Sequence, residues 1–400
     1  MTSSREHIEL SEAYGAHNYA PLDVVIARSE GAWVYSVEGE RYLDLLSAYS
    51  ALNFGHSNPR FLQTAHQQLD RITLSSRAFY NDQFGPFCRE LAEFCGMEMV
   101  LAMNSGAEAV ETALKAARRW GYDRKGVPAD QAEVICFRNN FAGRTISVIS
   151  FSSSEEQRRG FGPFTPGFRI VPFGDAEALE AAITKNTVAV LLEPIQGEAG
   201  VLIPPDGFLK SVRRLCDQNR VLMIADEIQT GLCRTGEVFA CNHEGVKPDL
   251  YTLGKSLGAG IIPISAVIGS RDVLGVFDPG SHGSTFGGNP LACAIARDVI
   301  AYIRTERPHL WARDLGKVFI EALRAMNSPY VAAIRGRGLM IGVDIKPQFG
   351  AAKDICKKLK THHVLAKDTR SQTIRFAPAL TISRADLEWG IEQIRAVFVP

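Results

Sequence analysis

VLMIADEIQTG (residues 221–231) and DLYTLGKSLGAG (residues 249–260) are the two stretches that decide the fold. In the first, an apolar run of five residues stops abruptly at Asp226, and in the second a shorter run ends at Lys255. Buried strands of parallel sheets have this continuous apolar character, and their carboxyl ends meet the ligand crevice of α/β folds. The two stretches therefore predict core strands that present Asp226 and Lys255 at one edge of a sheet.

A carboxylate and a lysine at the ends of two core strands suit pyridoxal phosphate. The aldehyde of this cofactor needs a lysine to form a Schiff base, and its ring nitrogen needs an anion. Taken alone, each residue has an ordinary explanation, because an Asp at a strand end can cap a turn and a single Lys is usually a solvated charge. The other motifs of the chain decide between these interpretations.

On both sides of these stretches, apolar runs of strand length alternate with amphipathic runs of helical period. The strand-like runs include EVICF (133–137), TISVISF (145–151), FRIVPF (168–173), TVAVLLEP (187–194) and PISAVIG (263–269). Helix-like runs such as AEALEAAI (176–183) and GFLKSVRRLCDQ (207–218) lie between them. This alternation predicts an α/β fold with a mostly parallel central sheet and helices on both faces.

The pattern divides the chain into three parts. Residues 1–53 begin polar and then alternate around Glu38-Gly39, which predicts a hairpin within a small lobe. Residues 54–290 carry the α/β pattern and form the expected large domain that binds the cofactor. Residues 291–400 read as long helices with a few strands, which predicts a smaller α+β domain. No internal repeat or low-complexity linker separates the parts, so we expect two closely packed lobes.

A second informative block is MVLAMNSGAEAVETALKAARRW (99–120). Ser105 is followed three residues later by Glu108, which is the capping-box spacing, and apolar residues then recur at helical intervals. The free N–H groups and positive dipole at such a helix start can bind an anion such as the cofactor phosphate. An ordinary capped helix shows the same pattern, so this block alone does not identify a phosphate site.

Composition narrows the classes of function. Lys plus Arg and Asp plus Glu are both 44, so the net charge is zero and no basic surface for nucleic acid is predicted. The eight cysteines form no C-x-x-C pair, which predicts reduced thiols and no structural zinc. The N-terminus has no apolar signal core, and no window approaches the roughly 20 apolar residues of a membrane span. We therefore expect a cytoplasmic protein without a membrane partner.

The motifs of several other enzyme classes are incomplete in this sequence or absent from it. The glycines of 336–342 have one residue too many for the dinucleotide motif G-x-G-x-x-G, and they lead into a strand. The stretch 231–237 has the glycine spacing of a Walker loop, but Glu237 stands where the phosphate-binding lysine is required. Neither the hydrolase motif G-x-S-x-G nor the metal motif H-E-x-x-H occurs, so no metal site is expected.

Eleven motifs then follow one another over nearly the whole chain. They are NYAPLDVVI (18–26), YLDLLSAYSALNFGH (42–56), TLSSRAFYNDQ (73–83), NSGAEAVETA (104–113), NFAGRTIS (140–147), RGFGPFTPGF (159–168), EPIQGEAGV (193–201), ADEIQTGLCRTG (225–236), GKSLGAG (254–260), GSHGSTFGGNPLA (280–292) and IRFAPAL (374–380). In this order they resemble the class III aminotransferases, a family of fold-type I enzymes that use pyridoxal 5'-phosphate. Within that class the chain is most similar to the ornithine δ-aminotransferases.

The resemblance implies roles around the cofactor ring. Lys255 would bond the cofactor and move the proton, and Asp226 would pair with the pyridine nitrogen. Gln229 would contact the ring hydroxyl, and Phe141 would stack on the ring.

It also implies a phosphate site shared between subunits. The turn at Ser105, Gly106 and Ala107 would hold the phosphate, and Thr285, with Ser284, would complete that site from the neighbouring subunit. The resemblance therefore implies a homodimer or a larger assembly of dimers.

For the substrates, the resemblance implies transfer of the δ-amino group of L-ornithine to 2-oxoglutarate. Arg375 would bind the α-carboxylate of glutamate or 2-oxoglutarate, and Glu198 would mask it when ornithine enters, because an open arginine favours bidentate carboxylate binding. Arg144 and Tyr19 would hold the other end of the substrates, and Tyr49 would lie at the wall of the site.

Three residues depart from the family pattern, namely Ala20, Phe54 and Ala142. Family members commonly have histidine, glutamine, and histidine or tryptophan at these places, so we expect a changed pocket near the cofactor or substrate. Two alternatives follow, a transaminase of another ω-amino acid or diamine and a racemase of a basic amino acid. A non-catalytic protein with the same fold would be expected to have lost Lys255 or Asp226, and both are present.

Overall fold

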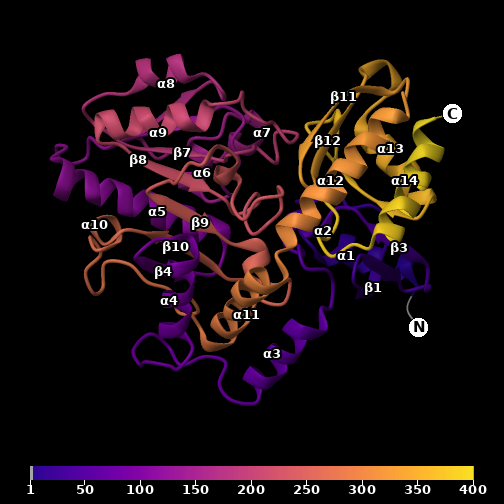
Figure 1. Ribbon diagram of the computed structural model, residues 1–400, viewed down its shortest axis with the longest axis horizontal. Coiled ribbons are helices and arrows are strands. Elements are labelled where there is room, and N and C mark those ends of the chain that lie inside the picture. The colour runs from indigo at the N-terminus through magenta and orange to yellow at the C-terminus, as the bar shows by residue number, and fades with distance from the viewer. Residues whose placement is uncertain (1–2, 400) are drawn as a thin grey trace.

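The computed structural model describes residues 3–399, and the chain forms two lobes. The larger lobe surrounds a seven-stranded sheet, and the smaller lobe contains two four-stranded sheets. Figure 1 shows the larger lobe on the left and the smaller one on the right, with both ends of the chain on the smaller lobe. The smaller lobe is therefore built from the two ends of the sequence.

The central sheet of the larger lobe is mostly parallel, as the sequence predicts. In spatial order its strands are β4 (Met99–Met103), β10 (Ser265–Gly269), β9 (Leu250–Leu253), β8 (Leu222–Asp226), β7 (Thr187–Leu192), β5 (Glu133–Phe137) and β6 (Phe168–Val171). The five strands from β9 to β6 are parallel, whereas β10 is antiparallel to both of its neighbours. Every residue of β7 and β8 is buried, which explains their continuous apolar runs.

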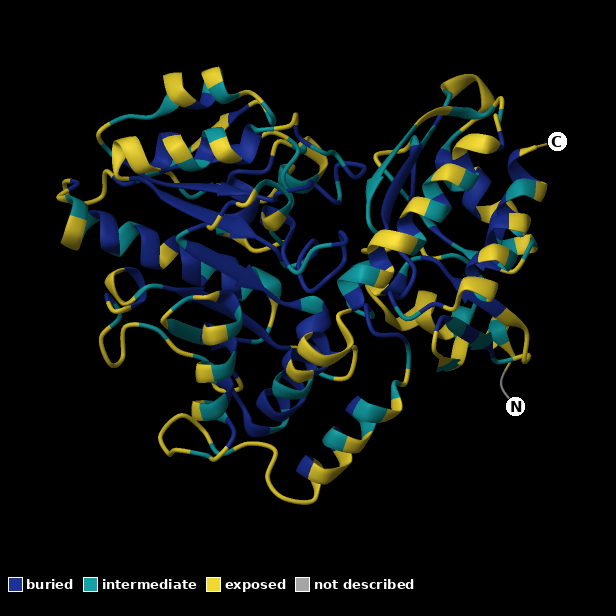
Figure 2. Ribbon diagram, viewed as in Figure 1, coloured by how far each residue is buried: buried dark blue, intermediate teal, exposed yellow. Residues whose placement is uncertain are grey.

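Helices cover both faces of this sheet. They are α3 (Pro59–Leu69), α4 (Phe84–Cys95), α5 (Gly106–Trp120), α8 (Ala176–Ala182), α9 (Phe208–Asn219), α10 (Arg271–Leu274) and α11 (Pro290–Glu306). Along β5, Val134 packs with the residues of α5, whereas Ile135 packs with those of α9 on the opposite face. Figure 2 shows the buried strands in dark blue between helices whose outer sides are exposed. Short helical turns η1 (Gly121–Lys125), η2 (Ala240–Glu244) and η3 (Lys255–Gly258) complete this lobe.

The run TISVISF (145–151) corrects one prediction, because it forms no strand. It contains the short helix α6 (Ile146–Ser150), and α7 (Glu155–Arg158) follows. Val148 and Ile149 are buried, and α6 packs against α5. The neighbouring strand β5 is already paired on both edges, with β6 and β7, so no sheet edge is open to this run. Packing against α5 therefore overrides the strand preference of β-branched residues.

The smaller lobe combines both chain ends in two sheets. One sheet contains β1 (Ile26–Glu30), β2 (Trp33–Ser36), β3 (Arg41–Asp44) and β13 (Val364–Leu365), and the other contains β11 (Val331–Arg337), β12 (Met340–Ile345), β15 (Thr373–Phe376) and β14 (Lys367–Thr369). The predicted hairpin around Glu38-Gly39 is confirmed, because β2 and β3 are antiparallel. The helices of this lobe are α12 (Pro308–Ala325), η4 (Pro347–Phe349), α13 (Ala352–Thr361) and α14 (Arg384–Phe398).

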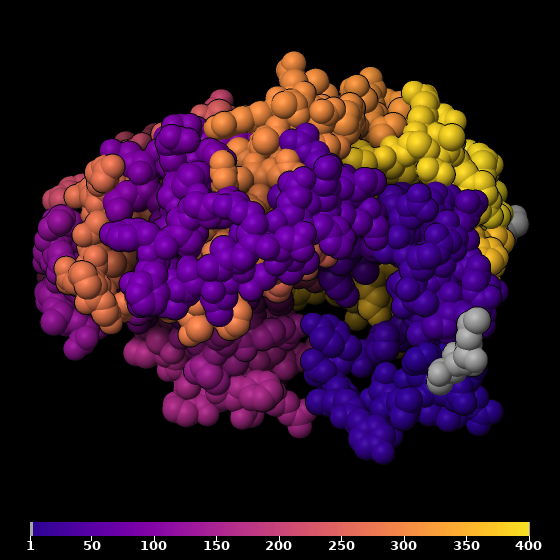
Figure 3. Space-filling view, turned by 90° about the horizontal axis from the view of Figure 1, so that it is seen from below, coloured from indigo at the N-terminus to yellow at the C-terminus, as the bar shows by residue number. Residues whose placement is uncertain are grey.

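The N-terminal region adds two helices that the sequence does not predict. Helix α1 (Ser4–Tyr14) begins with a capping box from Ser3 and has no buried residue, so it carries no apolar stripe to reveal it. Figure 3 shows this indigo region at one end of the molecule, beside the violet segment that follows it in sequence. The short turn α2 (Ser47–Ser50) has four successive residues in the left-handed region, with φ between 46° and 70°.

A buried arginine joins the two lobes. Arg234 is fully buried, and its guanidinium donates to Asn53 Oδ1 at 2.6 Å, to the Leu339 carbonyl at 3.0 Å and to the Pro378 carbonyl at 2.6 Å. No carboxylate of residues 3–399 forms an ion pair with it, and burial lowers the pKa of Arg234 to about 9. The loop that follows β8 is therefore fastened to the smaller lobe by neutral acceptors.

Candidate active site

Asp226 and Lys255 lie on neighbouring elements at one edge of the central sheet. Asp226 is the last residue of β8, and Lys255 opens η3 directly after β9, with which β8 is paired in parallel. Both line a cavity of about 260 Å³. Six of the residues predicted for the cofactor site line this cavity, namely Gly106, Ala107, Phe141, Asp226, Gln229 and Lys255.

The Asp226 carboxylate is held by hydrogen bonds from the loop that follows β8 and from the neighbouring strand β9. Its Oδ1 accepts hydrogen bonds from the Ile228 amide and from Thr252 Oγ1, both at 3.1 Å. Burial raises the pKa of Asp226 to about 6, against these hydrogen bonds and the charge of Lys255, which lower it. A cationic partner within the cavity would reverse this shift, because opposite charge favours the carboxylate.

Lys255 lies in the cavity wall and is not a freely solvated charge. Burial lowers the pKa of its amine, although the charges of Glu198 and Asp226 act in the opposite direction. The residue has a left-handed backbone, with φ of 45°, at the point where β9 ends. A lowered pKa increases the fraction of neutral, reactive amine at neutral pH.

The predicted helix start is present beside these two residues. Ser105 caps α5, with the Glu108 amide donating to its Oγ at 3.2 Å, and the reciprocal bond to the Glu108 carboxylate completes the capping box. The packing is close here, because a Cβ on Gly106 would lie 3.0 Å from Ile228 Cδ1. Ser105 itself lines a neighbouring cavity of about 330 Å³, which shares Gly106 and Lys255 with the first.

A buried arginine and a carboxylate lie next to Gln229, which lines the cavity. Arg375, on β15, is 2% exposed, and its Nη1 donates to Glu198 Oε1 at 2.6 Å. Gln229 Nε2 donates to the same oxygen at 3.0 Å. Burial raises the pKa of Glu198, but the charge and hydrogen bond of Arg375 outweigh it, and the net pKa is lowered. The Arg375 guanidinium carbon also lies 4.9 Å from the ring centre of Tyr49.

The remaining predicted residues lie around these groups. Tyr19 and Tyr49 line a cavity of about 500 Å³ in which Lys367 also takes part. The guanidinium carbon of Arg144 is 5.4 Å from the ring centre of Phe141.

Two of the predicted phosphate residues lie apart from the first cavity. Ser284 Oγ accepts a hydrogen bond from Asn104 Nδ2 at 2.9 Å, beside the start of α5. Thr285 is exposed and does not line the cavity of its own subunit.

The three departures from the family pattern have different surroundings. Ala142 lines the cavity that contains Lys255, and Ala20 lines the cavity that contains Tyr19. The expectation for Phe54 is wrong, because its side chain is buried in the core against Phe61 and Tyr302, with ring centres 5.7 and 5.3 Å away. An aromatic ring at this position gains more from apolar packing than from a polar pocket.

Glu193 is a cavity residue that the sequence analysis does not single out. It follows β7 and lines the cavity with Asp226, and its carboxylate accepts from the Phe141 amide at 2.9 Å. A signal was present, because a carboxylate directly after the apolar run TVAVLL repeats the pattern that identified Asp226.

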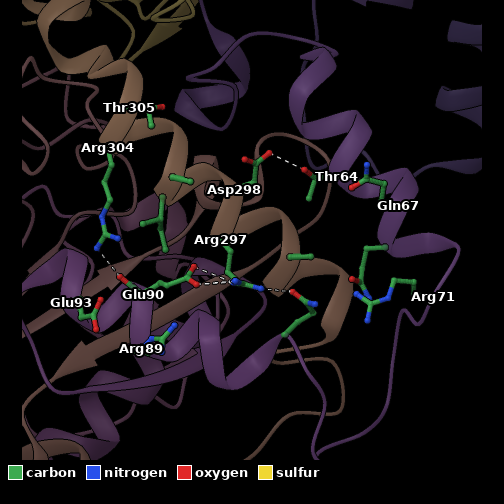
Figure 4. Close-up of a pocket in the computed structure, with 15 residues that line it drawn as sticks. Thr64, Gln67, Arg71, Arg89, Glu90, Glu93, Arg297, Asp298, Arg304 and Thr305 are labelled. Carbon is green, nitrogen blue, oxygen red and sulfur yellow. Dashed lines mark hydrogen bonds and ion pairs between the residues drawn. The ribbon is translucent and has the colours of Figure 1, made fainter.

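A cavity of about 840 Å³, larger than those described above, lies between α3, α4 and α11, away from these groups. Figure 4 shows that some of its charged side chains, including Arg297 and Glu90, are bonded to one another. Arg297 is paired with Glu90 at 2.9 Å, and Thr64 donates to Asp298 at 2.9 Å. Its size therefore does not make it the candidate active site.

Other site types are not supported by the described part of the chain. Residues 3–399 contain no cluster of three or more side chains that could hold a metal ion. None of the helices in this range is long and apolar enough to cross a membrane. All eight cysteines are free, and burial raises the pKa of several of their thiols, including Cys88 to about 12.

Comparisons with known proteins agree with this geometry. The family model described as aminotransferase class-III matches residues 14–398. An ornithine aminotransferase of Brevibacillus brevis is 55% identical over 99% of this chain and 99% of its own length. A solved ornithine aminotransferase structure from Toxoplasma gondii, described as having partial occupancy of PLP at its active site, has a TM-score of 0.98 and 44% identity, and covers 99% of this chain and 94% of its own.

An acetylornithine aminotransferase structure from Elizabethkingia anophelis is also similar, with a TM-score of 0.90, 41% identity and full coverage of both chains. The family match spans both lobes, including Asp226, Lys255 and Arg375. This chain therefore belongs to the class III aminotransferases.

Proposed function

We propose that this protein is a pyridoxal-phosphate-dependent ornithine δ-aminotransferase. It transfers the δ-amino group of L-ornithine to 2-oxoglutarate and gives L-glutamate and glutamate 5-semialdehyde, which closes to pyrroline-5-carboxylate. The relative from Brevibacillus brevis, named an ornithine aminotransferase, supports this donor by its 55% identity over nearly the whole chain. The structural observation that carries the proposal is the buried Arg375 held by Glu198.

The residues of the cavity fit pyridoxal 5'-phosphate. Asp226 Oδ2 accepts none of the hydrogen bonds within residues 3–399, and it would take the ring nitrogen. Gln229 lines the cavity and has a buried Oε1 without a partner in the described chain, which suits the ring hydroxyl. The N–H groups of Gly106 and Ala107 at the start of α5 would hold the phosphate. Phe141 would stack on the ring.

When bound, pyridoxal phosphate supplies the electron sink for breaking a bond at the substrate carbon. Asp226 offers a fixed, buried carboxylate, which would favour a positive charge on the ring nitrogen. The Lys255 amine would bond the cofactor, and as a free amine it would take up the proton released at the substrate carbon. Its lowered pKa suits both tasks.

The Glu198–Arg375 pair would decide which substrate end is bound. With Glu198 on Nη1, the guanidinium is occupied and ornithine can enter with its terminal amine toward Lys255. When Glu198 turns away, Arg375 can bind the α-carboxylate of glutamate or 2-oxoglutarate through two parallel hydrogen bonds. Arg144 and Tyr19 would hold the opposite end of the substrate, with Tyr49 as a wall beside Arg375.

We also propose a homodimer, or an assembly of such dimers, with shared sites. Thr285, with Ser284, would complete the phosphate site of the neighbouring subunit, in keeping with its exposure here. The segment that joins α3 to α4 exposes Phe79 and Tyr80, at 73% and 103%. Exposed aromatic side chains of this kind are typical of interfaces. The free cysteines support a cytoplasmic location.

A donor screen monitored by the cofactor absorbance tests the proposed function. The protein is mixed with L-ornithine in the absence of an oxo acid, and pyrroline-5-carboxylate is trapped. Bleaching of the absorbance together with trapped product supports δ-transamination. Loss of optical activity without net amino transfer would instead identify a racemase.

A second candidate is a transaminase of another ω-amine. Ala20 and Ala142 favour it, because each leaves a small side chain on the wall of a cavity where family members commonly have a larger one. The screen therefore includes N-acetylornithine, 4-aminobutyrate and putrescine. A higher kcat/KM for any of these than for L-ornithine would contradict the proposed donor.

A further inference from the structure

Glu193 is a buried carboxylate that lines the cofactor cavity and has no role in the steps above. Its Oε1 accepts a hydrogen bond from the Phe141 amide at 2.9 Å, and its Oε2 accepts one from the Gly197 amide at 3.3 Å. The two amides belong to separate loops, one after β5 and one after β7. One side chain therefore connects two loops that approach the cavity from different strands.

Each of these loops carries a residue with a proposed function. The first carries Phe141, whose ring would stack on the cofactor. In the second, Gly197 immediately precedes Glu198, which masks Arg375. The connection is local, because each hydrogen bond ends on the backbone of the functional residue or of its direct neighbour.

We propose that Glu193 is a positioning residue that fixes the loop under the cofactor ring to the loop of the Glu198 gate. The inference rests on the proposed function, because it assigns a purpose to the Glu198–Arg375 pair. With Gly197 held, the gate opens by rotation of the Glu198 side chain and not by movement of its backbone. With Phe141 held, the ring keeps its height above the cofactor while the gate changes state.

The surroundings of Glu193 support a positioning role over an electrostatic one. No lysine or arginine of residues 3–399 forms an ion pair with it. Burial, and next the charge of Asp226, raise the pKa of Glu193 to about 8, so the carboxylate is placed where charge is unfavourable. Two convergent backbone N–H groups are the favourable contacts that it makes.

The second loop has little freedom besides this hydrogen bond. A Cβ on Gly197 would lie 1.5 Å from Gln229 Oε1, so the backbone here is in close contact with a cavity residue. A parallel connection exists one residue earlier, where Gln196 Nε2 donates to the Arg138 carbonyl at 2.9 Å. The two loops are therefore tied at two places, and Glu193 forms the tie nearest the gate.

Glu193→Gln tests this assignment with almost no change of volume. An amide has a single acceptor oxygen, so one of the two backbone N–H groups must face an NH₂ group. Glu244→Gln is the matched control, because Glu244 also accepts from two backbone amides, those of Gly207 and Lys210, both at 3.1 Å, and lines neither active-site cavity. Both variants lose the same type of contact.

Two measurements are made on the holoenzyme and on protein stripped of cofactor. The first is the ratio of kcat/KM for L-ornithine to that for L-glutamate in the amine-donating half-reaction. The second is the Kd of pyridoxal phosphate, from absorbance titration. Glu193→Gln is expected to lower the ratio and to raise the Kd, each by about tenfold, the size of one buried N–H group left without an acceptor. Glu244→Gln is expected to change neither, whatever its effect on thermal stability.

An unchanged ratio and Kd in a folded Glu193→Gln protein would overturn the inference. If that variant does not fold, single-amide hydrogen exchange of the wild-type holoenzyme decides. Strong protection of both the Phe141 and Gly197 amides supports the tie, and rapid exchange of either one refutes it. If wild-type protein does not react with ornithine, the proposed function is refuted. The Kd of pyridoxal phosphate and the exchange data still test the positioning role of Glu193 independently.

Discussion

Glu198 Oε1 lies 2.6 Å from Arg375 Nη1, while Nε and Nη2 of the same guanidinium are buried and have no hydrogen-bond partner within residues 3–399. A buried guanidinium with open donors is costly unless a further acceptor arrives. A substrate carboxylate is such an acceptor, and it can bind two of the donors in parallel. In this pair Glu198 therefore occupies one donor of Arg375, and two donors remain for a substrate carboxylate in the proposed function.

Removing the Glu198 carboxylate from Arg375 should change which amino donor is preferred. Glu198→Ala is expected to raise kcat/KM for L-glutamate and to lower that for L-ornithine, so that their ratio shifts by roughly tenfold or more, since charged hydrogen bonds of this kind contribute about 1.5–3 kcal/mol. Stopped-flow absorbance of the first half-reaction measures both constants. Glu177→Ala, an exposed position in α8, is the control. An unchanged preference would refute the masking role.

Replacing Arg375 should weaken the binding of the oxo acid. Arg375→Lys keeps a positive charge but loses the planar pair of donors, so KM for 2-oxoglutarate is expected to rise by at least about tenfold. The reaction of L-ornithine alone should be less affected, because in that half-reaction Arg375 is covered. Steady-state kinetics with each substrate varied in turn separates the two effects, and equal losses in both would count against the assignment.

Lys255→Ala should prevent covalent attachment of the cofactor. After borohydride reduction, the wild-type protein is expected to gain the mass of the reduced cofactor, and the variant is not. Lys247→Ala, at an exposed lysine that donates to the Gly96 carbonyl, should behave as wild type. Intact-mass spectrometry reads the result directly, and a stable adduct on the Lys255→Ala protein would disprove the role of this lysine.

Gly197→Ala should disturb the cofactor site through Gln229. The new Cβ would lie 1.5 Å from Gln229 Oε1, so the amide must move from its position in the cavity wall. We expect the Kd of pyridoxal phosphate to rise by roughly tenfold, the effect of losing about one hydrogen bond. Gly85→Ala is the control, because a Cβ there meets nothing within 4 Å and its φ is not in the left-handed region. Equal Kd values for the two variants would contradict this packing.

The cofactor-free protein should lose stability with rising pH because of Glu193. Burial raises the pKa of this carboxyl to about 8 from 4.5, so its contribution is fully present below pH 4.5 and is lost as the pH rises through 8. The Glu193→Gln protein lacks this titration. The difference in free energy of unfolding between wild type and variant should therefore move in favour of the variant between pH 5 and 9, which urea denaturation at each pH measures. A constant difference would show that Glu193 does not titrate in this interval.

The sequence predicts well those features that depend on local pattern. The apolar runs before Asp226 and Lys255 indicate buried strands, and parallel pairing brings both ends to one edge. The capping box of Ser105 and Glu108 is present, because its hydrogen bonds span only three residues. The class III assignment rests on long ordered motifs and is confirmed by the family match.

Other features depend on contacts that no local pattern contains. The strand predicted for 145–151 is a helix because its apolar side chains meet α5 and the edges of β5 are occupied. Phe54 occupies a motif position, but the position does not say which way a side chain points, and the ring turns into the core. Arg234 reaches acceptors 181, 105 and 144 residues away in sequence, at Asn53, Leu339 and Pro378.

The buried guanidinium of Arg234 also couples the folding of the two lobes. Its acceptors come from three distant parts of the chain, at Asn53, Leu339 and Pro378. If one lobe opened alone, the buried guanidinium would be left with unfilled donors, which is unfavourable. We therefore expect the two lobes to unfold together in one cooperative transition.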